Sequence, residues 1–291
     1  MARLEDRLAE NADGDLFVDR SCIDCAICRI VAPHTFARSA RAGSSFVARQ
    51  PVDAGDLLRA RMALVSCPTS SIGTRAKPAL DEAIDALPEP LGDGIYFCGF
   101  AAESSYGAQS YLVVRDGGNV LVDSPRAAPR LLERIEALGG ARTMLLTHRD
   151  DVADHARIAA RLGCTRILHA RDVTAATRDV ERRIEGDEPV RLADDLVVIP
   201  VPGHTAGSAA LLYRDLALFS GDHLFATEPS EGPPRLYASR SVCWHSWEEQ
   251  RASLERLLAW DFRWVLPGHA GRLRVDTTAE MRALLREAIG R

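Results

Sequence analysis

Three cysteines within seven residues, Cys22, Cys25 and Cys28, constrain this chain more than any other feature of its sequence. Disulfides between such close neighbours are geometrically poor, so the spacing favours metal binding by reduced thiols. A tight loop can turn three thiolates inward around one face of an iron-sulfur cluster, and a fourth ligand must then come from elsewhere in the chain. Cys67, which Pro68 follows, is the candidate, and its distance from the first three cysteines favours a single cluster.

The residues around these cysteines resemble the single-cluster bacterial ferredoxins over about residues 13–75. The similarity includes residues 31–36, after the cysteine run, and residues 63–72, which are predicted to contain a helix leading into the Cys-Pro ligand. The resemblance implies a 4Fe-4S cluster held by Cys22, Cys25, Cys28 and Cys67. A structural zinc ion on the same four cysteines is the alternative, but zinc sites usually pair two two-cysteine knuckles. The other cysteines are predicted to be small packed hydrophobes: Cys98, Cys164 and Cys243.

The composition is that of an ordinary globular protein. The chain has 291 residues, of which 46% are hydrophobic and 26% charged, and this excludes the disordered classes. Because 36 basic residues face 41 acidic ones, no general attraction to nucleic acid is expected. The longest uncharged run, residues 196–213, contains proline and glycine and cannot cross a membrane as one helix. The N-terminus lacks the apolar core of a signal peptide, which predicts a cytoplasmic location.

Residues that break helices and strands divide the chain into two predicted domains. We expect a ferredoxin-like domain at residues 1–76, a linker rich in proline and glycine at 77–93 with one short helical stretch at 79–86, and a second domain at 94–291. In the second domain, short apolar runs alternate with amphipathic helical patterns, which predicts a layered α/β fold. Strands are expected at 111–114, 120–122, 144–147, 166–169, 196–201, 209–213, 216–220 and 264–266, and helices at 128–138, 152–162, 247–260 and 278–288.

Residues that could bind metal follow several of these predicted strands. They are Asp123, His148, His204, Asp222 and His269. A lone histidine after a strand is more often a hydrogen-bonded structural residue than a ligand. Five such positions in one domain instead predict a common metal site.

The order of these segments resembles the metallo-β-lactamase superfamily over roughly residues 95–275. Its five signatures correspond to residues 121–124, 147–155, 202–208, 220–223 and 266–269. The resemblance implies an αββα sandwich with two metals at the top of its sheets, here preceded by a small α+β ferredoxin-like domain. In family terms, the first metal would be bound by His148 and His204, the second by Asp154, His155 and His269, and both by Asp222. Asp123 would orient a ligand, and Asp222 and Asp154 are the expected catalytic residues.

The second signature departs from the family pattern His-x-His-x-Asp-His. Two residues are inserted and the middle histidine is missing, so we expect Asp150, or alternatively Asp151, to supply an oxygen ligand. Either aspartate could instead cap a helix that starts near Val152, with Asp154 completing a capping box. In that case the first metal site would be weakened or empty.

Two functions of different classes follow from this combination of domains. Paired divalent metals support hydrolysis, the common superfamily activity on thioesters, lactams or phosphodiesters. A carboxylate in place of an imidazole favours iron or manganese over zinc, and the flavodiiron proteins of this superfamily share an acidic residue in the second signature. We therefore predict an iron-dependent oxidoreductase in which the 4Fe-4S domain supplies electrons to a non-haem di-iron site that activates oxygen or reduces a small-molecule substrate.

An electron-donor reductase is the partner that this prediction implies. The first alternative is a metal-dependent hydrolase of a thioester or related activated ester, with a structural or redox-sensing cluster. The second is a metal-depleted electron-transfer or regulatory protein. In each case the segment 226–247, which contains prolines, glycines and aromatic residues, is predicted to form a pocket wall or lid.

Overall fold

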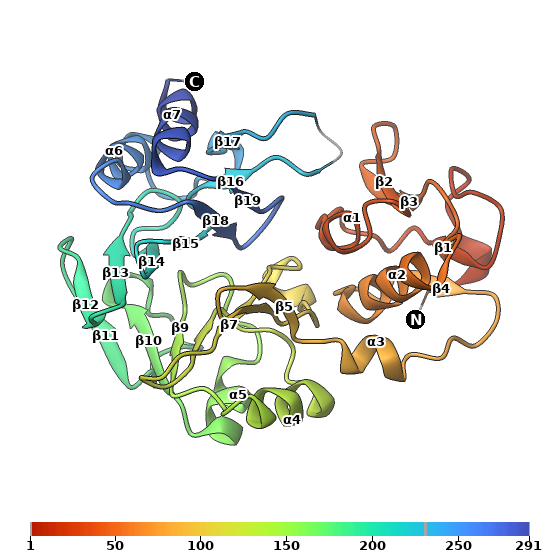
Figure 1. Cartoon of the computed structure of the whole chain (residues 1–291), viewed down its shortest axis with the longest axis horizontal. Coiled ribbons are helices and arrows are strands. Elements are labelled where there is room, and N and C mark those ends of the chain that lie inside the picture. Colours follow the sequence, from red (N-terminus) through yellow and green to blue (C-terminus); the bar gives the residue numbers. More distant parts are fainter. Residues whose placement is uncertain (1, 230–231, 291) are drawn as a thin grey trace.

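The computed structural model of the chain describes residues 2–229 and 232–290. It places a small N-terminal domain beside a larger C-terminal domain (Figure 1). None of the described helices is long and apolar enough to span a lipid bilayer.

The N-terminal domain combines short strands with two helices of unequal length. Its elements are β1 (Leu16–Val18), α1 (Ile27–Val31), β2 (Phe36–Ser39), β3 (Ser44–Val47), α2 (Ala54–Ser66) and β4 (Ile72–Thr74), after a 3-10 turn at Leu4–Asp6. β1 pairs with β4 and β2 with β3, both antiparallel. The longer helix, α2, begins where the Asp53 carboxylate accepts a hydrogen bond from the Asp56 amide, and it ends directly before Cys67.

The C-terminal domain is built on two facing sheets. In the described chain the first sheet has the order β11-β10-β9-β8-β7-β6-β5, and the second has the order β12-β13-β14-β15-β18-β19. The strands of the first are β5 (Glu89–Gly92), β6 (Ile95–Phe97), β7 (Tyr111–Val113), β8 (Val120–Val122), β9 (Thr143–Leu145), β10 (Thr165–His169) and β11 (Arg182–Ile184). Those of the second are β12 (Val190–Ala193), β13 (Leu196–Pro200), β14 (Ala209–Tyr213), β15 (Ala217–Gly221), β18 (Trp264–Pro267) and β19 (Leu273–Arg274). A separate pair consists of β16 (Phe225–Ala226) and β17 (Leu236–Tyr237).

Helices cover the outer faces of both sheets (Figure 1). Against the first sheet lie α4 (Pro129–Ala137) and α5 (His155–Leu162), and against the second lie α6 (Trp247–Leu257) and α7 (Thr278–Ile289). Both α6 and α7 start with a serine or threonine whose hydroxyl accepts a hydrogen bond from the amide three residues later. The arrangement confirms the predicted αββα sandwich preceded by a small α+β domain.

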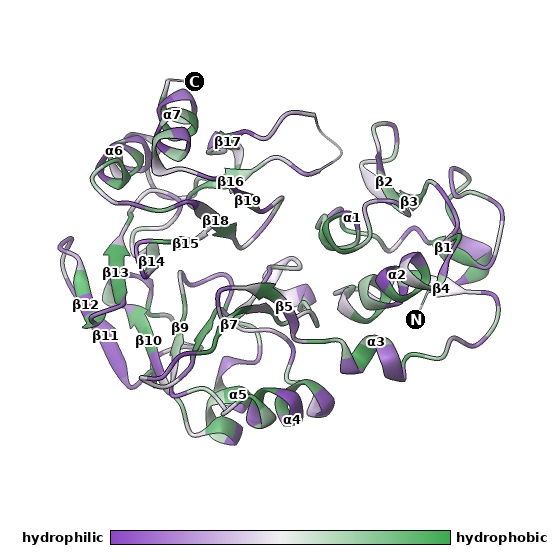
Figure 2. Cartoon of the chain, viewed as in Figure 1, coloured by the Kyte–Doolittle hydropathy of each residue, from purple (hydrophilic) through white to green (hydrophobic). Residues whose placement is uncertain are grey.

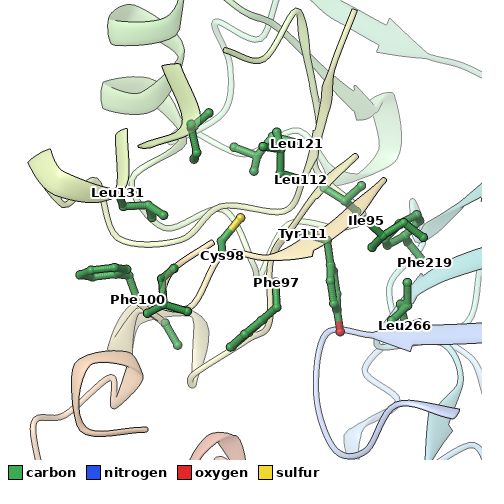
Figure 3. Close-up of a cluster of buried hydrophobic side chains, with 14 of the residues drawn as sticks. Ile95, Phe97, Cys98, Phe100, Tyr111, Leu112, Leu121, Leu131, Phe219 and Leu266 are labelled. Atoms are coloured by element: carbon green, nitrogen blue, oxygen red, sulfur yellow. The ribbon is translucent and has the colours of Figure 1, made fainter. Parts of the chain in front are cut away.

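The core of the sandwich lies between the sheets, whose strands carry many hydrophobic residues (Figure 2). Phe97, Tyr111, Phe219 and Leu266 meet there (Figure 3). The Tyr111 and Phe219 rings lie 5.4 Å apart, and the Tyr111 hydroxyl donates a hydrogen bond to the Pro267 carbonyl at 2.8 Å. This bond ties the two sheets together directly below the end of β18.

The segment predicted as a linker, residues 77–93, is largely structured. It contains α3 (Asp81–Asp85) and β5, and β5 pairs antiparallel with β6. Residues 89–92 therefore form the edge strand of the first sheet and belong to the C-terminal domain. An edge strand tolerates the proline at position 90, because one side of the strand donates no ladder hydrogen bonds.

One continuous hydrophobic cluster extends through both domains. It includes Ile27 and Val65 of the N-terminal domain and Phe100 and Tyr111 of the C-terminal domain. The Ala101 amide also donates a hydrogen bond to the carbonyl of Ser66, the last residue of α2. The two domains are therefore packed as one body.

Candidate metal centre

Strands from both sheets end at the same edge of the sandwich. β13 and β15 are both antiparallel to β14, and β18 is parallel to β15, so these three strands share one direction. His204, Asp222 and His269 lie just beyond their carboxyl ends, and His148 lies beyond β9 of the other sheet. In α/β folds this edge is where ligands bind.

A first group of possible metal donors consists of His148, Asp150 and His204, whose donor atoms all lie within 4.8 Å of one another. His204 Nε2 is 3.6 Å from Asp150 Oδ2. The two histidine rings are almost perpendicular, with centroids 4.7 Å apart. Asp150 is the most exposed of the three residues and lies on the side of the site that faces solvent.

A second group consists of His148, Asp151 and Asp222, also within 4.8 Å. His269 adjoins it, because its Nε2 lies 3.8 Å from Asp151 Oδ1 and 3.7 Å from Asp222 Oδ2. Asp222 Oδ2 is also 3.9 Å from His204 Nε2. Asp222 therefore stands between the two groups.

Several of these donor atoms are buried without a hydrogen-bond partner among the residues that the structure describes. They are His148 Nε2, His204 Nε2, Asp151 Oδ2 and Asp222 Oδ1. Buried polar atoms in proteins nearly always have a partner. Unpaired imidazole and carboxylate atoms that converge on one place fit a site for divalent metal.

Neighbouring groups hold the two buried histidines in orientation. The Asp123 carboxylate accepts hydrogen bonds from the Thr147 amide at 2.7 Å and hydroxyl at 3.0 Å, and that hydroxyl is 2.9 Å from His148 Nδ1. His204 Nδ1 lies 2.6 Å from the Val242 carbonyl. With Nδ1 engaged in each ring, Nε2 is the atom left for a metal.

The carboxylates also control the charge of the histidines in the metal-free protein. Burial alone would lower the pKa of His269, but Asp222 and Asp151 raise it to about 9. Burial likewise opposes protonation of His204, yet Asp150 and Asp222 raise its pKa. The nearby His204 ring in turn holds the pKa of Asp150 below its usual value.

Gly268 allows the acidic residues to approach one another. A Cβ at this position would lie 2.7 Å from Asp222 Oδ1 and 2.9 Å from Asp151 Oδ2. No real Cβ tolerates such contacts, so any side chain here would displace the carboxylates.

A cleft of about 920 Å³ opens onto these donors. Tyr106 and Trp244 line it, and both are more than half exposed, at 58% and 60%. The Tyr106 ring lies 6.2 Å from that of His269, and the Trp244 ring lies 6.2 Å from that of His204. Tyr237 and Val242, from the segment predicted as a wall or lid, also line the cleft, but residues 230 and 231 of that segment lie outside the described residues.

Comparison with solved structures decides the fold of this domain. The BLEG-1 B3 metallo-β-lactamase superposes with a TM-score of 0.50 at 17% identity, over 65% of this chain and 96% of that one. The C-terminal domain has the metallo-β-lactamase fold. The structure of VMB-1 superposes equally well, with a TM-score of 0.50 at 16% identity, over 69% of this chain and 96% of that one.

Curated relatives of the chain are named as hydrolases. The hydroxyacylglutathione hydrolase of Acidiphilium cryptum is 32% identical over 52% of this chain and 59% of its own length. That of Methylococcus capsulatus is 34% identical over 47% of this chain and 53% of its own length. The chain thus spans a little over half the length of these relatives.

The similarity to these hydrolases corrects the activity that was predicted from the sequence. An enzyme of the metallo-β-lactamase fold is supported, but the iron-dependent oxidoreductase predicted from the sequence is wrong, because the matching relatives are hydroxyacylglutathione hydrolases. The presence of an iron-sulfur domain had suggested electron transfer, but a cofactor in the same chain does not specify what the second site does.

The donor atoms that the structure brings together differ from those expected of the second signature. Asp154 and His155, expected to bind the second metal, belong to neither donor group of the described chain. Asp154 Oδ2 accepts a hydrogen bond from the Ala127 amide at 2.8 Å, and His155 Nδ1 lies 3.2 Å from the Arg166 guanidinium. Asp151 stands beside His269 instead, almost fully buried.

The inserted residues explain this difference. In the family pattern the aspartate and histidine stand four and five residues after the first histidine, whereas Asp154 and His155 stand six and seven residues after His148. They therefore fall at the start of α5, with Asp154 at the N-cap. No side chain caps that helix, so Asp150 and Asp151 do not serve as caps either.

The N-terminal domain contains the expected cysteine site. Residues 18–74 match the family model of the 4Fe-4S single cluster domain of Ferredoxin I. Cys22, Cys25, Cys28 and Cys67 are all free thiols that line one cavity. Burial and the neighbouring thiols raise the pKa of Cys25 to about 12 and that of Cys28 well above its usual value. Four cysteines that converge on one cavity fit the ligand set of an iron-sulfur cluster.

Proposed function

We propose that the protein is a metal-dependent hydrolase of thioesters or related activated esters. The observation that carries the proposal is the convergence of unpaired histidine and aspartate donors at the carboxyl ends of strands, open to a cleft. The hydroxyacylglutathione hydrolases among the relatives support thioesters as the substrate class. The same convergence favours a metal enzyme over the metal-depleted alternative.

Two divalent metals would share this site. His148, Asp150 and His204 would hold one, Asp151 and His269 the other, and Asp222 would contact both. A donor set of three imidazoles and three carboxylates suits zinc, iron or manganese. When bound, such metals supply Lewis acidity toward the acyl oxygen and lower the pKa of water enough for attack at neutral pH.

The remaining residues position the reactants. Thr147 and Asp123 fix the His148 ring, and Val242 fixes His204. Asp150, whose pKa His204 lowers, is ionised at neutral pH, as a carboxylate ligand must be, and it lines the cleft. Tyr106 and Trp244 stand beside the two metal-side histidines and would contact the acyl and thiol portions of a substrate.

Hydrolysis of S-lactoylglutathione by the full-length protein tests the proposal. Release of the free thiol should be measured with the protein as purified, after removal of the loosely held metals, and after adding back zinc, iron(II) or manganese singly. We expect activity to disappear with the metals and to return with at least one of them, in proportion to the bound metal.

A panel of other thioesters and activated carboxylic esters should be assayed in parallel. The Asp222→Asn variant should lose both metal and turnover, whereas Arg171→Met, which removes an exposed ion pair, should keep both. A fully metallated protein that hydrolyses no member of the panel would contradict the proposal.

A further inference from the structure

The cleft above the metal centre is lined by both domains. Asp24, Cys25 and Ala26 of the cysteine loop form one side of it, and Tyr106 and His269 of the metallo-β-lactamase domain lie on another. Cys25 also lines the cavity between the four cysteines. Cys25 therefore borders both the cluster site and the substrate cleft.

A close contact links this cysteine to the residue beside the metal centre. A Cβ at Gly107 would lie 2.6 Å from Cys25 Cβ and 2.9 Å from its Sγ, so the backbone of Gly107 packs directly on Cys25. Gly107 (φ 81°) follows Tyr106, which also has a positive φ of 48°. A shift of Cys25 toward Gly107 would therefore displace the backbone that carries Tyr106.

The backbone on both sides of Cys25 is strained. Asp24 has φ 59° and Ala26 has φ 69°, in a region that costs a non-glycine residue about 1 kcal/mol or more. Such conformations persist only where the surroundings hold them. Arg29 and Arg38 hold the Asp24 carboxylate. A cluster bound through Cys25 would add a restraint between Asp24 and Ala26, and its removal would allow that part of the loop to relax.

Other contacts between the domains adjoin the same cysteines. Arg126 donates hydrogen bonds to the carbonyls of Val65, at 2.8 Å, and of Cys67, at 3.5 Å. Arg29, the residue after Cys28, is paired with Glu228 beside the cleft. The cysteine site is thus tied to the C-terminal domain beside Cys67, and to the cleft itself beside Cys28.

On the basis of the proposed function, we infer that the cluster-binding loop is a wall of the substrate cleft, and that Cys25, through Gly107, positions Tyr106 against the substrate. Tyr106 is then a substrate-positioning residue, and occupancy of the cluster site sets the affinity of the enzyme for its thioester. The cluster acts here through the shape of residues 24–26 and 103–107, without any transfer of electrons.

Cluster-loaded and cluster-free full-length protein, both with the metal centre filled, provide the test. We expect amide hydrogen exchange of residues 103–107 to accelerate when the cluster is removed. The KM for S-lactoylglutathione should rise about threefold to tenfold, the range expected for the loss of one aromatic contact, while kcat changes less than the KM. Metal content should be measured to show that the second site is unchanged.

Gly107→Ala, with Gly140→Ala as its control, disturbs the contact with Cys25, and to a lesser extent that with Pro68 at 3.1 Å. Both glycines have a positive φ, of 81° and 70°, so both variants carry backbone strain, but a Cβ at Gly140 meets no atom within 4 Å. In cluster-loaded protein, Gly107→Ala should raise both the KM and the rate of amide hydrogen exchange at residues 103–107. Gly140→Ala should raise neither. Tyr106→Ala should reproduce the higher KM, and Tyr106→Phe should not.

Unchanged exchange of residues 103–107 after cluster removal would overturn the role of Cys25, whether or not Gly107→Ala folds. A KM that stays the same in cluster-free protein would overturn the role of the loop as a cleft wall. Failure of the loaded wild-type protein to hydrolyse any thioester would instead refute the proposed function, and hydrogen exchange would then decide the coupling between Cys25 and Tyr106.

Discussion

Arg29 of the N-terminal domain donates two hydrogen bonds to Glu228 of the C-terminal domain, from Nε to Oε2 at 2.6 Å and from Nη2 to Oε1 at 2.8 Å. Both side chains are buried, with 2% and 8% of their surface exposed. Arg29 also donates to Asp24 at 2.7 Å. The pair therefore connects the cysteine loop to the segment that borders the cleft.

Replacing Arg29 with methionine should destabilise the protein strongly, because the buried Glu228 carboxylate would lose the cation that faces it. Breaking a buried ion pair costs about 3–5 kcal/mol. The double variant Arg29→Met/Glu228→Gln should recover part of this loss. The midpoint of thermal unfolding measures both effects, with the exposed pair Arg171–Asp187 as a control that should contribute less than about 1 kcal/mol. If breaking the Arg29–Glu228 pair and breaking the Arg171–Asp187 pair lowered the unfolding midpoint equally, the structural role of Arg29 would be contradicted.

Asp151→Asn and Asp154→Asn distinguish the observed site from the one expected from the family pattern. Asp151 lies beside His148 and His269, whereas Asp154 accepts a hydrogen bond from the Ala127 amide. We expect Asp151→Asn to lose one metal per chain and most of its turnover, while Asp154→Asn keeps both. Metal analysis and thioester hydrolysis provide the measurements. The opposite pattern would restore Asp154 as a ligand.

Thr147→Val should weaken metal binding although Thr147 offers no donor to the metal. Its hydroxyl connects Asp123 to His148 Nδ1, and loss of such an orienting contact typically costs about tenfold to a hundredfold in metal affinity. Competition with a chelator gives the affinity. Thr174→Val, which removes a hydroxyl hydrogen-bonded to Thr177, serves as the control and should leave it unchanged. An unaltered affinity in Thr147→Val would show that His148 needs no support.

Stability of the metal-free protein should fall as the pH rises past neutrality. Asp222 and Asp151 raise the pKa of His269 from 6.5 to about 9, so the protonated form is favoured by folding. The resulting stabilisation is complete below pH 6.5 and is lost as the pH rises through 9, with an upper limit of about 3 kcal/mol. The difference in unfolding free energy between wild type and His269→Asn should therefore shrink between pH 6 and pH 10. A constant difference would show that His269 is neutral in the folded protein.

Much of the candidate site could be predicted from sequence because its donors follow apolar runs. His148, His204, Asp222 and His269 each stand just beyond a predicted strand, and strands of like direction end at one edge of a sheet. The choice between Asp151 and Asp154 could not be predicted. It depends on where α5 begins, and helix boundaries are the least certain part of any reading from sequence.

Other features depend on contacts between distant parts of the chain. Residues 89–92 contain a proline and a glycine and carry no strand signal of their own, so only pairing with β6 reveals β5. The contact of Gly107 with Cys25 joins two segments with no shared local pattern. The sequence also could not show that the cysteine loop borders the cleft. Without that contact, electron transfer was the expected link between the cysteine site and the metal centre.

The continuous cluster that includes Val65 and Phe100 has a consequence for how this protein can change over generations. A shortened gene that began at β5 would expose to water the apolar side chains that now pack against the N-terminal domain, which favours aggregation over folding of a working half. Replacing the N-terminal domain with an unrelated ferredoxin domain would have the same effect, because the replacement would lack a surface complementary to the C-terminal domain. Because the two domains share one hydrophobic cluster, we expect a disruptive substitution on one side of their boundary to require compensation on the other.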